Sequence, residues 1–277
     1  MHLSMHNWMR AEPIEVTIRR LAKYGYESIE ISGEPEKDDT KEVRQLLDAY
    51  GLRCWGSVTL MFAGLNFPSA DEATRERTLK YVKDCITMVK ELEGEVMTIV
   101  PGTVGKVNAD STPEKEWAWA VDGLKEVYAY GQQAGVRLAL EPLNRFETDL
   151  INVVEQGLAL CEAVGSPHVG LHLDTFHMHL EERDSAAAIR RAGDRLFHFH
   201  ACENDRGVPG RGQVEWGAVA DALFDIEYDG AVVIESFTPE VKSIARAVCI
   251  WRDIAPNQDT IAAEGLAFLR ELRLRYE

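Results

Sequence analysis

Four polar residues in the second half of the chain each end a short apolar run, and their types suit metal chemistry. They are Glu141 after Leu-Ala-Leu, Asp174 after Leu-His-Leu, His200 after Phe-His-Phe, and Glu235 after Val-Val-Ile. Three carboxylates and one imidazole brought together would repel one another without a cation. This oxygen-rich set with one nitrogen predicts a single divalent metal ion, with Mn²⁺ favoured over Mg²⁺ or Co²⁺.

The spacing of these four residues predicts that they meet. Successive members are separated by 33, 26 and 35 residues, about the length of one strand-and-helix unit. In a barrel of parallel strands, residues that end the strands lie at the mouth where active sites of this fold are built. One such carboxylate alone would be an ordinary solvated residue, but four in consecutive units favour a shared site.

The elements that would carry these residues can be read along the whole chain, where short Val-, Ile- and Leu-rich runs alternate with amphipathic stretches. We expect strands at 3–8, 26–31, 53–59, 96–100, 137–141, 169–174, 196–200 and 231–235. A helix is predicted over 72–92, and Gly25, Gly51 and Gly135 are expected to end helices. Eight such units predict one α/β domain, residues 1–277, folded as a (β/α)₈ TIM barrel. No Gly-x-Gly-x-x-Gly follows the first strand, which disfavours an open dinucleotide-binding sheet.

The composition and net charge narrow the classes of partner and the cellular location to be expected. The net charge of −16, from 46 acidic and 30 basic residues, disfavours nucleic acid. No apolar run reaches the roughly 18 residues that a membrane span needs, and the N-terminus lacks an apolar signal-peptide core, so a cytoplasmic protein is expected. The five cysteines are scattered without a Cys-x-x-Cys pair, which predicts reduced, buried thiols.

Two further histidines lie on the predicted strands that end in Asp174 and His200. His172 and His198 each stand two residues before those strand ends and so share their strand face. They are expected inside the barrel, either orienting metal ligands or as ordinary core histidines.

Four motifs in order resemble those of the D-tagatose/D-psicose 3-epimerases, ketose 3-epimerases among the xylose-isomerase-like barrels. They are Glu-Pro-Leu-Asn-Arg-Phe-Glu at 141–147, His-Leu-Asp-Thr-Phe-His at 172–177, His-Ala-Cys-Glu-Asn-Asp-Arg-Gly-Val-Pro-Gly-Arg-Gly at 200–212, and Val-Ile-Glu-Ser-Phe at 233–237. The resemblance implies that the metal ligands are Glu141, Asp174, His200 and Glu235. It also implies that Glu141 and Glu235 are the paired catalytic acid and base.

The resemblance further implies how a sugar would be held. Glu147, His177 and Arg206 fall where the family binds the carbonyl end of the substrate. His6, on the first strand, lies where substrate identity would be decided and is predicted to contact the sugar. The resemblance also implies that the protein assembles as a homodimer or homotetramer. The loop 101–110 lacks the tryptophan that several family members place over the substrate.

The implied reaction is inversion of C3 of a free ketose through a metal-stabilised enediolate, with two glutamates as acid and base. An aldose–ketose isomerase acting on hydroxypyruvate or a short sugar such as erythrulose, and an inositol-ketone dehydratase, remain alternatives. A non-catalytic binding barrel is a further alternative. An endonuclease IV type of DNA repair enzyme is disfavoured, because no histidine lies between His6 and His168 and the chain is acidic.

Overall fold

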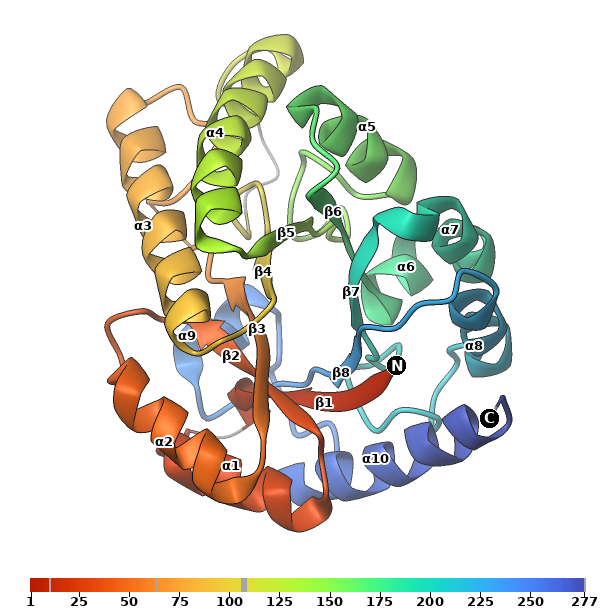
Figure 1. Ribbon diagram of the computed structural model, residues 1–277. Helices are drawn as coiled ribbons and strands as arrows, with labels where there is room; N and C mark the ends of the chain where they lie inside the picture. The colour runs from red at the N-terminus through yellow and green to blue at the C-terminus, as the bar shows by residue number, and fades with distance from the viewer. Residues whose placement is uncertain (10, 63, 106–108, 277) are drawn as a thin grey trace.

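The structure, a computed structural model, describes residues 1–9, 11–62, 64–105 and 109–276. Eight parallel strands form a closed barrel in chain order, with β1 paired to β8 (Figure 1). The strands are β1 (His2–His6), β2 (Ser28–Gly33), β3 (Arg53–Thr59), β4 (Val96–Ile99), β5 (Arg137–Leu140), β6 (Val169–Asp174), β7 (Leu196–His200) and β8 (Ala231–Ile234). The predicted TIM barrel is confirmed, and every predicted strand is present with its ends within two residues.

Helices surround the barrel as an outer ring (Figure 1). They are α1 (Ile14–Tyr24), α2 (Thr40–Tyr50), α3 (Glu72–Glu91), α4 (Pro113–Ala134), α5 (Val154–Val164), α6 (Thr175–Glu181), α7 (Ser185–Ala192), α8 (Trp216–Asp225), α9 (Lys242–Ala247) and α10 (Gln258–Leu274), with 3₁₀ turns η1 (Asn7–Met9) and η2 (Gly193–Arg195). The predicted helix-ending glycines Gly25, Gly51 and Gly135 are confirmed as left-handed C-caps. Trp8, expected in the first strand, lies instead in η1.

Strand β3 contains one residue more than its partner β2. Ile29 pairs with Cys54 and Glu30 pairs with Gly56, so Trp55 is the extra residue of a bulge. Bulges interrupt the alternation of a strand and redirect a side chain. The Trp55 side chain is accordingly buried in the barrel interior, where its indole nitrogen meets a side chain of β7.

Strand β7 carries a second irregularity of the same kind. Leu171 pairs with Leu196 and His172 pairs with His198, so Phe197 is the extra residue. Both extra residues belong to a buried apolar cluster drawn from five strands, made of Trp55, Val96, Ala139, Phe197, Ala231 and Val233. This cluster fills one layer of the barrel interior and leaves no pore.

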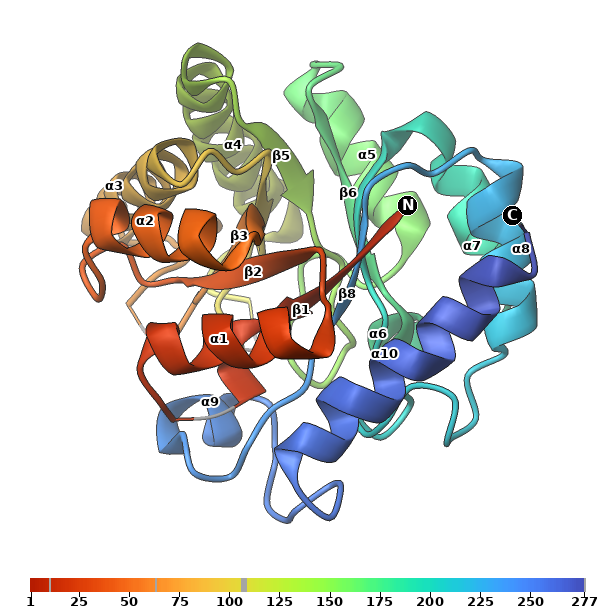
Figure 2. The ribbon, with the colours of Figure 1, turned by 60° about the horizontal axis from the view of Figure 1, so that its bottom comes forward.

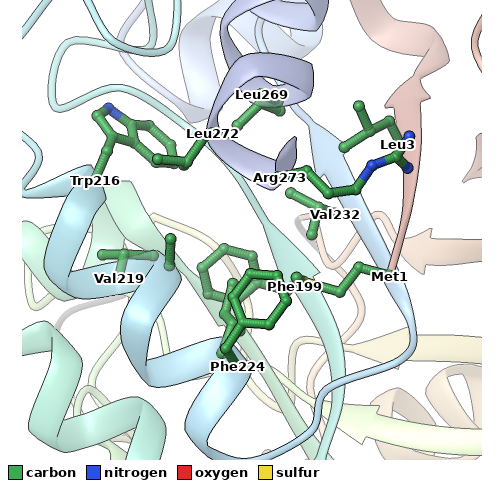
Figure 3. A pocket seen from close by; sticks show the side chains of 12 residues that line it. Met1, Leu3, Phe199, Trp216, Val219, Phe224, Val232, Leu269, Leu272 and Arg273 are labelled. Carbon is green, nitrogen blue, oxygen red and sulfur yellow. The ribbon is translucent and has the colours of Figure 1, made fainter. Parts of the chain in front are cut away.

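A small apolar cavity of about 30 Å³ lies outside the barrel between α8, α10 and the strands (Figure 3). Its labelled side chains are mostly aliphatic or aromatic, and its one charged residue, Arg273, is paired with Glu27 at 2.9 Å. A binding site needs several converging polar groups. We therefore assign this cavity to core packing.

The end of the barrel away from the N-terminus is covered by α9 (Figure 2). Ile244 and Ala245 of this helix join an apolar cluster with Trp8, Val58 and Phe237. Helix α9 begins at Lys242, three residues after Pro239.

None of the described helices has the length and apolarity that crossing a bilayer requires. Cys54, Cys85, Cys161 and Cys202 are buried and free, as predicted. Cys249 is exposed, so the prediction of burial was wrong there. It lies beyond α9 with a left-handed backbone (φ 56°), outside any strand or helix that would bury it.

Gly56 allows the close approach of β3 to β4. A Cβ at this position would lie 2.2 Å from the Val96 carbonyl oxygen, which is part of the sheet backbone. We expect Gly56→Ala to lower the free energy of unfolding by about 3 kcal/mol, measured by urea denaturation. In the matched control Gly217→Ala, in α8, the new Cβ meets nothing within 4 Å. This variant should keep or slightly raise stability, and equal stability of both variants would contradict the steric argument.

Candidate active site

The four predicted ligands converge at the carboxyl ends of four neighbouring strands. Asp174 and His200 are the last residues of β6 and β7, and Glu141 and Glu235 directly follow β5 and β8. All four side chains are buried. Donor atoms of Asp174, His200, Cys202 and Glu235 lie within 4.8 Å of one another, as do those of Glu141, Asp174 and His177. This buried cluster can hold a metal ion.

The orientation of His200 tests whether a metal fits. Its Nε2 is hydrogen-bonded to Glu30 Oε2 at 2.7 Å. Its Nδ1 faces Glu235 Oε2 at 3.5 Å and Asp174 Oδ2 at 3.8 Å, and has no hydrogen-bond partner among the described residues. A buried ring nitrogen without a partner that faces two carboxylates is the arrangement a metal ligand needs. The residues present therefore fit a divalent cation.

The site holds more buried negative than positive charge. Its buried carboxylates are those of Glu30, Glu141, Glu147, Asp174 and Glu235. Arg206 is the one lysine or arginine that is buried within the described ranges of the chain. An uncompensated buried charge costs several kcal/mol, so the excess of acids is balanced only if protons or a cation are bound.

The surroundings shift the pKa values of Glu141 and Glu235 in opposite directions. Burial raises the pKa of Glu141 well above its ordinary value, and the nearby Glu235 and Asp174 raise it further. Burial also raises the pKa of Glu235, but His200 and Arg206 outweigh this effect and hold that pKa below its ordinary value. Two carboxyl groups whose pKa values are shifted in opposite directions are suited to act as one acid and one base.

Arg206 lies against the ligands and away from solvent. Its Nη1 donates to Asp174 Oδ2 at 2.9 Å and to Glu235 Oε2 at 2.5 Å. The guanidinium carbon lies 4.1 Å from the ring centroid of Phe176 and 5.0 Å from that of Phe237. Two carboxylates and two aromatic faces therefore hold the charge in one place.

The loop that carries Arg206 is organised by Glu203, which is also buried. This carboxylate accepts hydrogen bonds from the backbone N–H groups of Asn204, Gly210 and Val214 and from the indole of Trp216. The backbone N–H of Arg206 donates to the Glu203 carbonyl, and Arg206 itself has a left-handed backbone (φ 63°). Sequence reasoning missed this role of Glu203, although it is one of only two acids within the glycine-rich loop motif at 200–212.

His177 and Glu147 are linked through Asn144. The backbone N–H of Asn144 donates to His177 Nδ1 at 3.1 Å, and the other ring nitrogen, Nε2, faces Arg206 and Glu141. This Nε2 lies 3.2 Å from Arg206 Nη2 and 3.9 Å from Glu141 Oε1. The Asn144 side chain donates to Glu147 Oε1 at 2.8 Å. The motif residues around the ligands are thus held in one network.

A cavity of about 50 Å³ lies above the ligands. Its polar lining consists of Thr59, Glu141, Glu147, His177, Arg206 and Glu235. The remaining lining residues are apolar and include Trp8, Leu60, Phe62, Phe237 and Ile244. A few polar groups below apolar walls are typical of sites that bind a small molecule and exclude water.

His6 lies behind Trp8, which lines the cavity. The two rings are 4.0 Å apart, and His6 Nδ1 accepts from the Trp8 backbone N–H at 3.1 Å. His6 Nε2 faces Glu30 Oε2 at 3.8 Å. A direct contact between His6 and a sugar remains a prediction.

The two interior histidines lie where the strand alternation predicts. His172 and His198 are fully buried and pack against the His200 ring, with centroids 4.0 and 4.9 Å away. His172 Nδ1 also lies 3.5 Å from Glu141 Oε2.

Two residues of the site were missed in the sequence. Glu30 on β2 is buried against His200, and its signal was one acid inside the apolar run Ile-Glu-Ile. The thiol of Cys202 lies 3.2 Å from Asp174 Oδ2, so the group of possible donors includes a sulfur that was not expected. Burial raises the pKa of this thiol well above its ordinary value.

Comparison with known proteins defines the class first. The family model described as "Xylose isomerase-like TIM barrel" matches residues 18–272, so the chain belongs to that family. A probable ketose 3-epimerase from Synechocystis sp. is 33% identical over 265 residues, covering 93% of this chain and 90% of that protein. An L-ribulose 3-epimerase from Methylomonas sp. is 31% identical, covering 90% and 88%.

A solved structure agrees with this assignment. The D-allulose 3-epimerase from Methylomonas sp. in complex with D-allulose superimposes with a TM-score of 0.92 at 28% identity, covering 98% of this chain and 96% of that one. Within the barrel family, the chain belongs to the ketose 3-epimerases, as its motifs predicted.

Glu203 offers a test of how the Arg206 loop is held. Glu203→Gln replaces an acceptor oxygen with a donor that faces N–H groups, so the local opening free energy of residues 203–215 should fall by about 2 kcal/mol. Hydrogen–deuterium exchange followed by mass spectrometry measures this change. Glu215→Gln, an exposed residue of the same loop without a capping hydrogen bond, is the control. Equal exchange in both variants would exclude the organising role.

Proposed function

We propose that the protein is a divalent-metal-dependent epimerase that inverts C3 of a free ketose. The observation that carries this proposal is the convergence of Glu141, Asp174, His200 and Glu235 in a buried cluster beneath a small cavity. Relatives named as ketose, L-ribulose and D-psicose 3-epimerases support the same reaction. Among divalent ions, Mn²⁺ suits a site dominated by carboxylates with one imidazole.

Inversion at C3 removes a weakly acidic proton beside a ketone and returns a proton to the opposite face. A divalent ion held by the four ligands would supply electrostatic stabilisation of the negative charge that develops in the enediolate. Glu235, whose pKa is held below its ordinary value, is the base for one direction. Glu141 is the second acid–base group and delivers the proton that is returned to the opposite face. The two exchange roles for the reverse direction.

Other residues of the cavity would hold the sugar. The Arg206 guanidinium is a donor next to Glu235, where substrate oxygens gain negative charge, and the His177 ring lies next to Glu141. Glu147 is a carboxylate acceptor suited to a sugar hydroxyl. The apolar walls of the cavity exclude water, which protects a reactive enediolate and strengthens these contacts. A homodimer or homotetramer in the cytoplasm remains our expectation for the assembly.

The reaction is tested by proton exchange. Metal-loaded enzyme is incubated in deuterated water with D-fructose, D-psicose, D-tagatose and L-ribulose, and the products are followed by NMR. We expect deuterium at C3 of an epimer, with the rate reduced at least about 10³-fold in Glu235→Gln because the base is lost. Glu240→Gln, an exposed glutamate of the same loop, should retain the rate.

The position of the label distinguishes the alternatives. Deuterium at C1 or C2 of an aldose would show that the enzyme is an aldose–ketose isomerase and not an epimerase. Absence of label from all four ketoses would refute the proposal for free sugars.

Metal affinity should increase with pH. Because its pKa is raised, the Glu141 carboxyl is protonated below that pKa, and the proton competes with the metal. As pH rises through this pKa the proton leaves, so the Kd for Mn²⁺ should fall about tenfold per pH unit for each proton released. Calorimetric titrations in two buffers of different ionisation enthalpy measure the released protons. A Kd that is constant from pH 5 to pH 8 would contradict this assignment of the Glu141 proton.

A further inference from the structure

Glu30 is a fully buried carboxylate to which the proposed reaction gives no role. It lies on β2 and faces imidazole rings from β1 and β7. Its Oε2 is 2.7 Å from His200 Nε2 and 3.8 Å from His6 Nε2, and its Oε1 is 2.6 Å from His198 Nε2. One carboxylate therefore contacts three imidazoles, and one of these belongs to a proposed metal ligand.

The hydrogen bonds on the far sides of the rings determine where the protons lie. Trp55 Nε1 donates to His198 Nδ1 at 2.7 Å. An indole nitrogen is only a donor, so His198 Nδ1 accepts and the neutral ring carries its proton on Nε2, facing Glu30. By the same argument, the Trp8 backbone N–H leaves the His6 proton on Nε2, which also faces Glu30.

The consequence for His200 follows from Glu30 Oε2, the carboxylate oxygen that does not face His198. Glu30 Oε2 accepts the Nε2 proton of His200, which leaves the lone pair of Nδ1 directed at Asp174 and Glu235. We propose that Glu30 is a positioning residue that sets the affinity of the site for its divalent ion, and that Trp55 and His198 hold its carboxylate in place. The inference rests on the proposed metal-dependent function, which it extends beyond the four ligands.

A purely packing role does not account for this arrangement. A buried carboxylate is costly unless its partners are in place, and an apolar side chain would fill the same volume. The bulge at Trp55 turns a large indole into the barrel interior, where its one polar atom meets His198. The bulge at Phe197 sets the register at which His198 and His200 both contact Glu30. Both irregularities therefore serve the same chain of contacts.

The test measures metal binding directly. Glu30→Gln keeps the shape but replaces one acceptor oxygen with an amide donor, which conflicts with one of the two Nε2 protons. We expect the calorimetric Kd for Mn²⁺ to rise about 10–100-fold in this variant. Trp55→Phe leaves the carboxylate intact and removes the hydrogen bond to His198 together with part of the buried indole, so it should raise the Kd less.

A matched control shows whether an effect depends on the location of Glu30 or follows from any buried Glu→Gln substitution. Glu116 on α4 is also a buried glutamate, and it accepts hydrogen bonds from the backbone N–H groups of Asp110 and Ser111. Glu116→Gln should leave the Kd for Mn²⁺ unchanged. Long-range ¹H–¹⁵N NMR of the Mg²⁺ complex gives a second readout, because it reports the tautomer of His200. Wild-type protein should show protonated Nε2, and Glu30→Gln should show a mixture with protonated Nδ1.

The outcomes distinguish this inference from the proposed function. Wild-type protein that binds no divalent ion would overturn both. Wild-type binding with an unchanged Kd in Glu30→Gln and Trp55→Phe would overturn the role of Glu30 alone. Lower thermal stability at constant Kd and constant tautomer would reduce Glu30 to a structural residue. Should Glu30→Gln fail to fold, the Kd and tautomer in Trp55→Phe decide the question.

Discussion

The structure depends on one electrostatic constraint, the excess of buried carboxylates over cations at the mouth of the barrel. Asp174, Glu141 and Glu235 are buried, and one arginine opposes them. Such a cluster is stable only with protons, a metal, or both. Burial raises the pKa of Glu141, and the neighbouring carboxylates Glu235 and Asp174, which would also attract a cation, raise it further. In the proposed function, metal binding and acid–base chemistry therefore both follow from the same buried carboxylates.

The barrel interior meets this constraint in layers. An apolar layer that includes Trp55 and Phe197 lies at one level, and the imidazoles of His172 and His198 lie next to the His200 ring. The histidines form a polar layer that can accept or donate hydrogen bonds without adding permanent charge. Glu30 is the acid of this layer, and His200 and His198 outweigh its burial and hold its pKa well below the ordinary value.

The sequence predicted what depends on local periodicity. Strand ends repeat once per unit, so the barrel and the convergence of the four strand-end residues could be predicted, and period-two alternation placed His172 and His198 inside. The bulges at Trp55 and Phe197 break that alternation, and their cause is the pairing with neighbouring strands. The role of Glu30 was hidden for the same reason, because its partners come from β1 and β7 and no local pattern joins them.

The difference in pKa between Glu141 and Glu235 depends in part on Arg206, which lies on a loop outside the barrel. Arg206 reaches Glu235 Oε2 at 2.5 Å, and for Glu141 its effect is smaller than that of burial. Its position requires a left-handed backbone, which is uncommon for a residue with a side chain. The hydrogen bonds to Glu203 and the Ser236 hydroxyl, which donates to the Arg206 carbonyl at 2.7 Å, stabilise that conformation. The strands thus bring the acids together, and Arg206 from this loop acts with His200 to hold the pKa of Glu235 below its ordinary value.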